Sequence, residues 1–171
     1  MKKYISLLMT VSLLLALAGL SSCAGKTSNV SAAGSFTLSA EPTALSPGDT
    51  FTVTLNGAGW ENVASFDVLL SASDNLSVVS CKEKDVGELI TTVSEVADGV
   101  KMGGYVMYTY DIENLDLLTV TYRVSENAKA GDTVKVQADF TQFQVGTDDN
   151  GDETVEKKAD IAVAPLELSI D

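Results

Sequence analysis

From residue 36 onward, apolar and polar side chains alternate along the chain with a period of two. Alternation that includes Thr, Val, Tyr and Phe is typical of strands with one buried and one exposed face. No window of helical length shows a sustained period of 3.6 residues. The pattern predicts strands at residues 36–40, 50–55, 65–70, 76–79, 89–93, 101–110, 117–124, 133–143, 153–163 and 166–170.

Turn-forming residues separate these segments. Gly, Pro, Asn and Asp gather at residues 46–49, 56–59, 97–99, 130–132 and 149–152. Many short strands joined by such turns favour an antiparallel arrangement in which two sheets face each other. We therefore predict an all-β fold, an antiparallel two-sheet sandwich with one core between the sheets.

The first residues follow a different pattern. Lys2 and Lys3 precede an apolar run over residues 4–20, which ends in Leu20-Ser21-Ser22-Cys23. A basic start, a short apolar run and small residues are typical of a secretory signal. The last four residues resemble the bacterial lipobox, which implies lipidation at Cys23. The alternative is an ordinary signal peptide with a chance cysteine.

This interpretation divides the chain into three parts. Residues 1–22 are the expected lipoprotein signal peptide, and residues 23–34 are a lipidated N-terminus with a flexible linker of small and polar residues. Residues 35–171 form the expected sandwich domain. The protein is then exported and anchored by lipid to the bacterial cell membrane, facing outside the cytoplasm.

Composition narrows the function. The net charge of −13 argues against nucleic acid as a partner. The sequence contains no histidine, which excludes Ser-His-Asp and Cys-His catalysis. We therefore expect no catalytic residues, no enzyme activity and no cofactor. With Cys23 assigned to lipid, Cys81 has no partner for a disulfide, and it is either a half-buried strand residue or a reactive thiol.

One acidic segment could hold a metal ion. Asp148, Asn150 and Asp152 place oxygen ligands at alternating positions and are weak candidates for a calcium site. The glycine at position 151 does not fit an EF-hand loop, because it comes before the third ligand position. The other interpretation is a hairpin turn built on Asn150-Gly151.

The order of segments resembles that of a cohesin domain, the receptor half of the cohesin–dockerin pair. The segments that carry the resemblance are Pro-Gly-Asp-Thr-Phe-Thr-Val-Thr-Leu at 47–55, then 63–70, 75–80, 117–124, 128–132 and 166–170. The resemblance covers about residues 35–171. It implies a nine-stranded jelly-roll sandwich, an architecture that cohesins share with family 3 carbohydrate-binding modules.

The resemblance also implies a partner surface on one sheet. In type I cohesins the third strand carries an Asn-x-Asp pair that faces the dockerin, and here Ser65 and Asp67 take these places. Alternation puts Ser65, Asp67 and Leu69 on the face opposite Phe66. Asp67 is either a partner contact or only a solvated strand residue. The short segment 110–116 departs from the longer one usual in cohesins, so part of the dockerin platform is expected to be missing.

We thus expect a non-catalytic, membrane-anchored binding module that holds a protein partner, such as a dockerin-bearing protein, at the cell envelope. The alternative is a carbohydrate-binding lipoprotein that recognises a polysaccharide through Tyr108 and Tyr110, which share a face in the predicted strand. Trp60 and Tyr105 are further aromatic candidates, and core packing is the competing role. Gly103-Gly104 suggests a bulge that could re-aim Tyr105.

Overall fold

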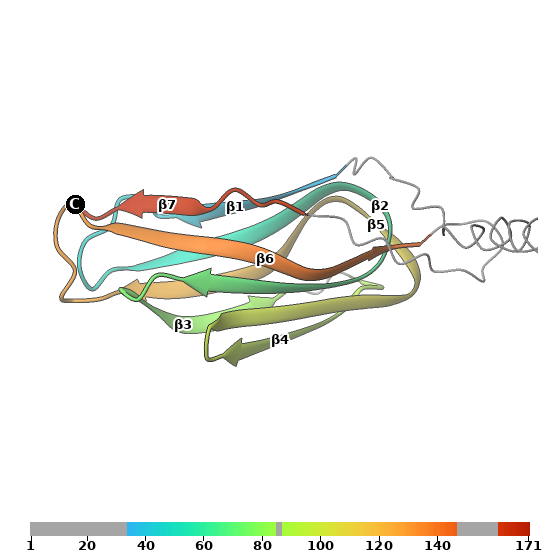
Figure 1. Ribbon diagram of the computed structural model, residues 1–171, viewed down its shortest axis with the longest axis horizontal. Coiled ribbons are helices and arrows are strands. Elements are labelled where there is room, and N and C mark those ends of the chain that lie inside the picture. The colour runs from blue at the N-terminus through green and yellow to red at the C-terminus, as the bar shows by residue number, and fades with distance from the viewer. Residues whose placement is uncertain (1–33, 85–86, 147–160) are drawn as a thin grey trace, which may run out of the picture. The chain divides into compact units, whose positions relative to one another are not determined.

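The computed structural model describes residues 34–84, 87–146 and 161–171. Within these residues every regular element is a strand, and no helix is long and apolar enough to cross a membrane. The strands are β1 (Ser35–Glu41), β2 (Thr50–Ala72), β3 (Leu76–Glu83), β4 (Ile90–Val96), β5 (Gly99–Val124), β6 (Thr133–Val145) and β7 (Leu166–Ser169) (Figure 1).

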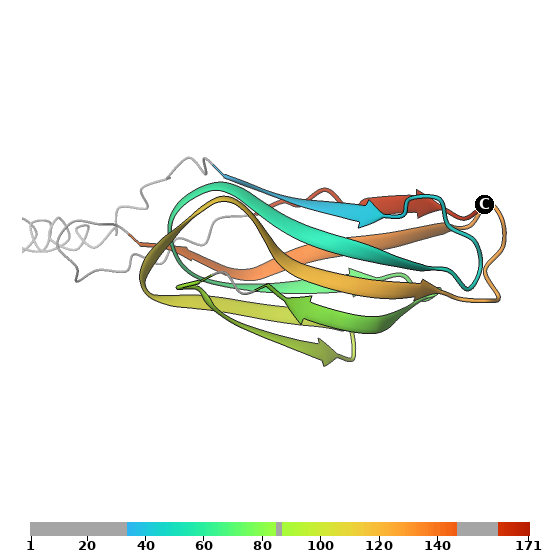
Figure 2. The same cartoon turned by 180° about the vertical axis from the view of Figure 1, so that it is seen from behind.

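Two of these strands, β2 and β5, are long enough to run through both layers. The first half of β2 pairs with β1 and with the second half of β5, from Thr50 opposite Arg123 to Trp60 opposite Ile112. The second half of β2 pairs with β6 and with the first half of β5. Both strands bend at the same end of the domain, as Figures 1 and 2 show. The segments 50–55 and 65–70, predicted as separate strands, are therefore the two halves of β2.

The pairing gives two antiparallel layers. One has the order β1–β2–β5–β3, and the other has the order β7–β6–β2–β5–β4. When β2 and β5 are counted once in each layer, the seven described strands make nine segments (7 + 2), as the jelly-roll interpretation requires. The all-β antiparallel sandwich is confirmed.

The core lies between the two layers. Alternate side chains of β2 are buried, including Phe66, Val68 and Leu70, and β5 supplies others such as Met102 and Tyr122. This alternation arises because successive side chains of a strand point to opposite faces. Along β2 the core is thus made of the residues that the period-two pattern assigns to one face.

Aromatic rings fill one part of the core. The rings of Phe36 and Trp60 stack with centroids 5.1 Å apart, and the ring of Phe143 lies 4.6 Å from that of Trp60. Trp60 is buried, and its Nε1 donates a hydrogen bond to the carbonyl oxygen of Ser35 at 3.1 Å. Trp60 therefore packs in the core. The prediction that it is exposed for stacking on a sugar is wrong.

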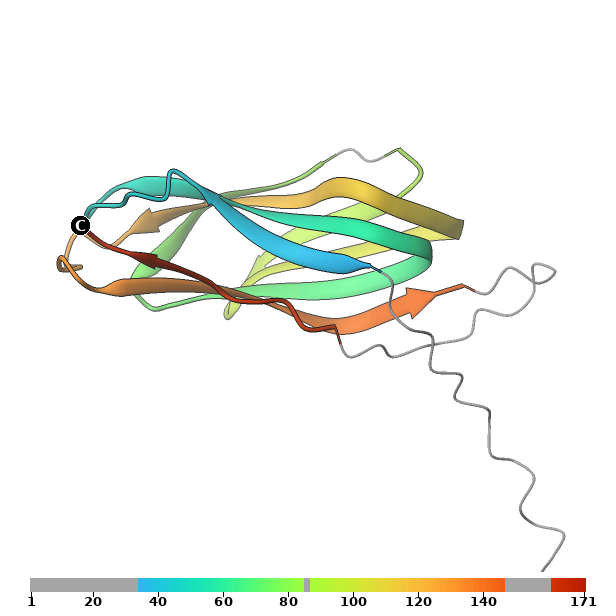
Figure 3. The same ribbon diagram turned by 90° about the horizontal axis from the view of Figure 1, so that it is seen from above.

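The edges of the two layers meet on both sides of the sandwich. β1 lies beside β7 on one side and β3 lies beside β4 on the other, as seen from above in Figure 3. Residues 161–163 precede β7 without strand structure, so the predicted strand over 153–163 is wrong at that end. The remainder of that segment lies outside the described residues.

Candidate functional site

The outer surface of the second layer gathers most of the candidate residues. Ser65, Asp67 and Leu69 point outward and are partly exposed, whereas Phe66 and its alternate neighbours are buried. The predicted division of this segment into two faces is confirmed. We call the outward side chains of this layer the four-strand face; its members are Gln142 and Gln144 on β6, Ser65, Asp67 and Leu69 on β2, Lys101 and Tyr105 on β5, and Ile90 and Thr92 on β4.

One row of side chains crosses the whole four-strand face. Ser65 lies opposite Gln144 on one side and Tyr105 on the other, and Tyr105 lies opposite Ile90. The Ser65 Oγ donates a hydrogen bond to Gln144 Oε1 at 2.6 Å. Tyr105 and Ile90 are 51% and 46% exposed, which is unusual for side chains of this size. The row therefore joins a polar pair to an exposed apolar pair.

Asp67 lies in the next row and has a basic neighbour. Its Oδ2 is 3.5 Å from Lys101 Nζ, and the two side chains are 35% and 48% exposed. An exposed ion pair of this kind contributes about 0–1 kcal/mol to stability. The carboxylate can therefore be used for a contact outside the domain without a large cost to the fold.

Gly103 and Gly104, which lie beside Asp67, do not form the predicted bulge. Gly103 and Gly104 pair in regular register with Asp67 and Phe66, so the expected bulge at this position is wrong. A Cβ on Gly103 would lie 2.9 Å from Asp67 Oδ1, and one on Gly104 would lie 2.6 Å from the Phe66 ring. Gly104 is needed because the buried Phe66 ring occupies that space, whereas the Asp67 carboxylate beside Gly103 is the end of a partly exposed side chain that can move aside.

The irregular part of β5 comes later in the strand. Val63 pairs with Tyr110 and Ser65 pairs with Tyr105, so the register shifts between these pairs. Tyr110 is half-buried and packs against the core. The side chain of Tyr108 lies outside the described residues. A flat strip made of Tyr108 and Tyr110 thus stays a prediction, while Tyr105 is the tyrosine found exposed.

The outer surface of the first layer carries a polar cluster whose members bind one another. Asn56 Nδ2 donates hydrogen bonds to Asn114 Oδ1 at 3.0 Å and to Asp116 Oδ1 at 3.1 Å. Lys84 Nζ lies 3.0 Å from Asp116 Oδ2. The hydrogen bond from Asn56, and then that from Lys84, holds the pKa of Asp116 below its usual value. This cluster offers no exposed large apolar side chain comparable to Tyr105.

Cys81 and Tyr122 lie where β3 pairs with β5. Cys81 is half-buried on β3, as one of its two interpretations predicted, and burial, then the charge of Glu95, raises the pKa of its thiol. Burial, followed by the nearby Cys81, raises the pKa of Tyr122 to about 12. Neither group is therefore tuned to ionise at neutral pH, which argues against nucleophilic chemistry here.

Several candidates are not placed by the structure. Cys23 and the acidic residues Asp148, Asn150 and Asp152 lie outside the described residues. Within the described ranges, no three acidic or cysteine side chains gather closely enough to hold a metal ion.

No family model and no curated protein matches the sequence. Solved structures do match. The sixth cohesin of scaffoldin B from Acetivibrio cellulolyticus, in complex with a mutant Cel5 dockerin, gives a TM-score of 0.59 at 12% identity over 80% of this chain and 99% of that chain. The cohesin module of a family 33 glycoside hydrolase from Clostridium perfringens gives 0.58 at 16% identity, over 82% and 98% of the two chains. The described domain has the cohesin fold.

A third matching structure comes from an archaeon. A non-cellulosomal cohesin from the archaeon Archaeoglobus fulgidus gives a TM-score of 0.56 at 14% identity, over 81% of this chain and 91% of that chain. Sequence reasoning predicts that Ser65, Asp67 and Leu69 share one face, but it did not identify Lys101, Tyr105 and Ile90 as their neighbours. Pairing between strands far apart in the chain brings those residues together.

Proposed function

We propose that this chain is a non-catalytic, membrane-anchored binding module that holds a protein partner at the cell envelope through the four-strand face. The observation that carries the proposal is the exposed row in which Tyr105 and Ile90 adjoin the polar Ser65–Gln144 pair. Aromatic anchors within a polar rim are typical of protein interfaces.

A dockerin-bearing protein is the partner class that we propose. Asp67 occupies the place that the resemblance to type I cohesins assigns to a dockerin contact, and it points outward on the four-strand face. One similar solved structure is a cohesin in complex with a dockerin. The proposed anchor is a lipid on Cys23, which the sequence around that cysteine supports.

The partner is first isolated by pull-down from the proteins of the source organism, and its affinity is then measured by titration calorimetry. Tyr105→Ala, Ile90→Ala and Asp67→Ala should each weaken binding by at least about tenfold, as central interface contacts do. Two variants on the other layer serve as matched controls. Val79→Ala removes an apolar side chain that is 49% exposed, close to the exposure of Ile90, and Asp116→Ala removes a carboxylate paired with a lysine.

If the controls weaken binding and the four-strand variants do not, the assigned surface is wrong. If the chain captures no protein and instead binds a polysaccharide in affinity electrophoresis, the carbohydrate alternative replaces this proposal. Tyr108 and Tyr110 are then the residues to change.

A further inference from the structure

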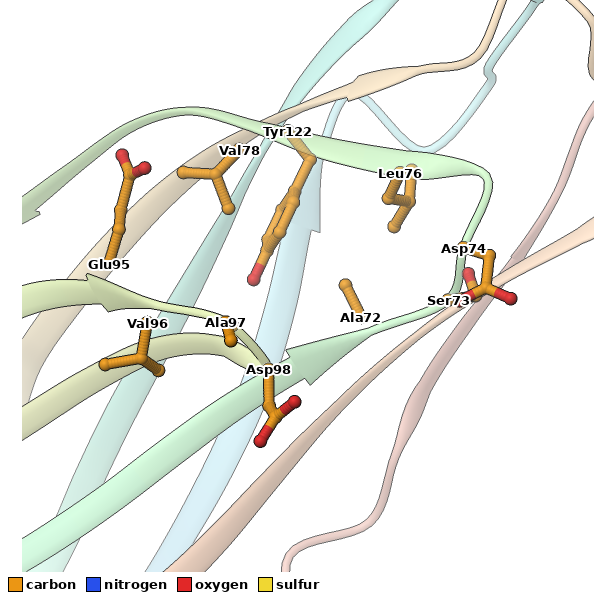
Figure 4. Close-up of a pocket in the computed structure, with 11 residues that line it drawn as sticks. Ala72, Ser73, Asp74, Leu76, Val78, Glu95, Val96, Ala97, Asp98 and Tyr122 are labelled. Atoms are coloured by element: carbon orange, nitrogen blue, oxygen red, sulfur yellow. The ribbon is translucent and has the colours of Figure 1, made fainter.

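A cavity lies between β3 and the turn that joins β4 to β5. Its volume is about 510 Å³, within the range of about 300–1,000 Å³ that holds small-molecule ligands. Figure 4 shows side chains from β3, from the turn and from β5 around it. None of its lining residues belongs to the four-strand face.

A buried hydroxyl group points into this cavity. The side chain of Tyr122 is 0% exposed, and its hydroxyl has no hydrogen-bond partner among the described residues. In Figure 4 the hydroxyl extends from β5 toward Val96 and Ala97. A buried hydroxyl without a partner is costly and rare, so each such group calls for an explanation. A ligand that supplies a hydrogen bond would provide one.

The ring of Tyr122 packs in the core, and this packing does not require the hydroxyl group. Its centroid lies 5.9 Å from that of Phe51, and both side chains are buried. A phenylalanine would fill the same space. The hydroxyl itself is therefore not explained by packing.

The charge around the cavity has one sign. Asp74, Glu95 and Asp98 line it, and no lysine or arginine is among its described lining residues. In Figure 4 these carboxylates lie around the margin and point away from the Tyr122 hydroxyl. Carboxylates of one sign beside a low-dielectric recess attract cations. Since the described residues form no metal-holding group, the expected cation is organic.

Part of the wall between the hydroxyl and the margin is apolar. Leu76 and Val78 on β3 and Ala72 at the end of β2 line it. A short chain of methylene groups would bury apolar surface against these side chains. The cavity thus offers a hydrogen-bonding group inside, an apolar wall and negative charge at the margin.

We propose that this cavity binds a small aliphatic amino alcohol, with its hydroxyl on Tyr122, its methylene chain against Leu76 and Val78, and its ammonium group at the margin near Asp98 and Glu95. Tyr122 remains protonated at neutral pH, so its hydroxyl can donate and accept. The inference does not depend on the proposed partner, because the two surfaces share no residue.

The test uses the full-length chain in detergent and follows backbone amides near the cavity by NMR during titration. The probe is 5-amino-1-pentanol. Pentylamine lacks the hydroxyl and 1,5-pentanediol lacks the charge. Each should bind about fivefold more weakly than the probe, the size expected for one net hydrogen bond or partly exposed charge contact.

Two variants assign these differences to residues. Tyr122→Phe should remove the preference for the probe over pentylamine but keep the preference over pentanediol. The double variant Glu95→Gln with Asp98→Asn should lose the preference for the probe over 1,5-pentanediol but keep the preference over pentylamine. Asp116→Asn, which changes a carboxylate outside the cavity, should alter neither. Circular dichroism checks that each variant is folded.

The proposal is overturned if the probe causes no saturable shifts at amides such as that of Ala97. It is equally overturned if folded Tyr122→Phe keeps the full preference for the hydroxyl. In both cases partner binding through the four-strand face can still be intact, so failure here is distinguishable from failure of the proposed function.

Discussion

Gly104 on β5 lies directly against the ring of Phe66 on β2. A Cβ at Gly104 would come 2.6 Å from the Cε1 and Cζ atoms of that ring, closer than side-chain carbons approach in folded proteins. Because Phe66 is buried, its ring cannot move into solvent. The two residues therefore fix each other's identity across the sheet.

Gly104→Ala should destabilise the domain by about 1–3 kcal/mol, the usual cost of overpacking a core. Urea unfolding gives the free energy of unfolding. Phe66→Leu in the same chain makes room for the new methyl group, so the double variant should lose less than the sum of the two single variants. Simple additivity would show that the contact with the ring is not what excludes alanine.

The two faces of β2 should respond in opposite ways to alanine. Phe66→Ala should cost about 3–5 kcal/mol because it leaves a cavity in the core. Asp67→Ala should stay within about 0.5 kcal/mol of the parent, as exposed positions usually do. Denaturant titration of both variants is sufficient, and a large loss in Asp67→Ala would mean that its pairing with Lys101 stabilises the fold.

Tyr122 should make the domain sensitive to alkaline pH. Burial raises the pKa of Tyr122 to about 12, whereas an unfolded tyrosine has a pKa of about 10. Its contribution is thus fully present below pH 10 and is lost as pH rises through 12, because the unfolded state gives up its proton first. The loss is about 3 kcal/mol for two pKa units.

Tyr122→Phe provides the comparison for this pH dependence. Lysines also titrate in the same window, so the difference between parent and variant isolates the phenol. The stability of the variant should fall less steeply above pH 10. Parallel curves would contradict an elevated pKa for Tyr122.

Cys23→Ser should release the protein from the membrane or leave an unprocessed precursor, because the proposed anchor needs the thiol. Cell fractionation and mass spectrometry of the N-terminus measure both outcomes. An unmodified N-terminus at a residue other than 23 in the parent protein would refute lipidation.

The acidic segment around Asp148, Asn150 and Asp152 should be indifferent to calcium if it is only a hairpin turn. A site saturated a hundredfold above its dissociation constant would stabilise the protein by about 2.7 kcal/mol. Thermal unfolding with calcium and with a chelator should therefore give the same midpoint. A rise of several degrees would favour the metal site instead.

Much of the architecture could be predicted because strand alternation is a local signal. The pattern from Ser65 to Leu70 specifies which side chains face the core, and the structure agrees. The joining of residues 50–72 into one strand could not be read this way. Asn56 and Gly57 are turn-formers in isolation, and only pairing with β1 and β5 holds them extended.

The candidate surfaces could also be predicted only where they depend on residues close together in the sequence. Asp67 was found from its place in one strand, whereas its neighbours Lys101 and Tyr105 come from a strand about 35 residues later. The cavity at Tyr122 needs β3 and the β4–β5 turn together. Alternation predicts that Tyr122 is buried, but it carries no information on whether its hydroxyl finds a partner.

The two long strands have a consequence for how the domain comes apart. Because β2 and β5 each belong to both layers, the two layers share the same backbones, and we expect them to unfold together. Amide protons in the regularly paired halves of both strands, on either side of the bend, should then exchange with solvent only through a single global opening. A domain built this way has no weaker half that unfolds before the other.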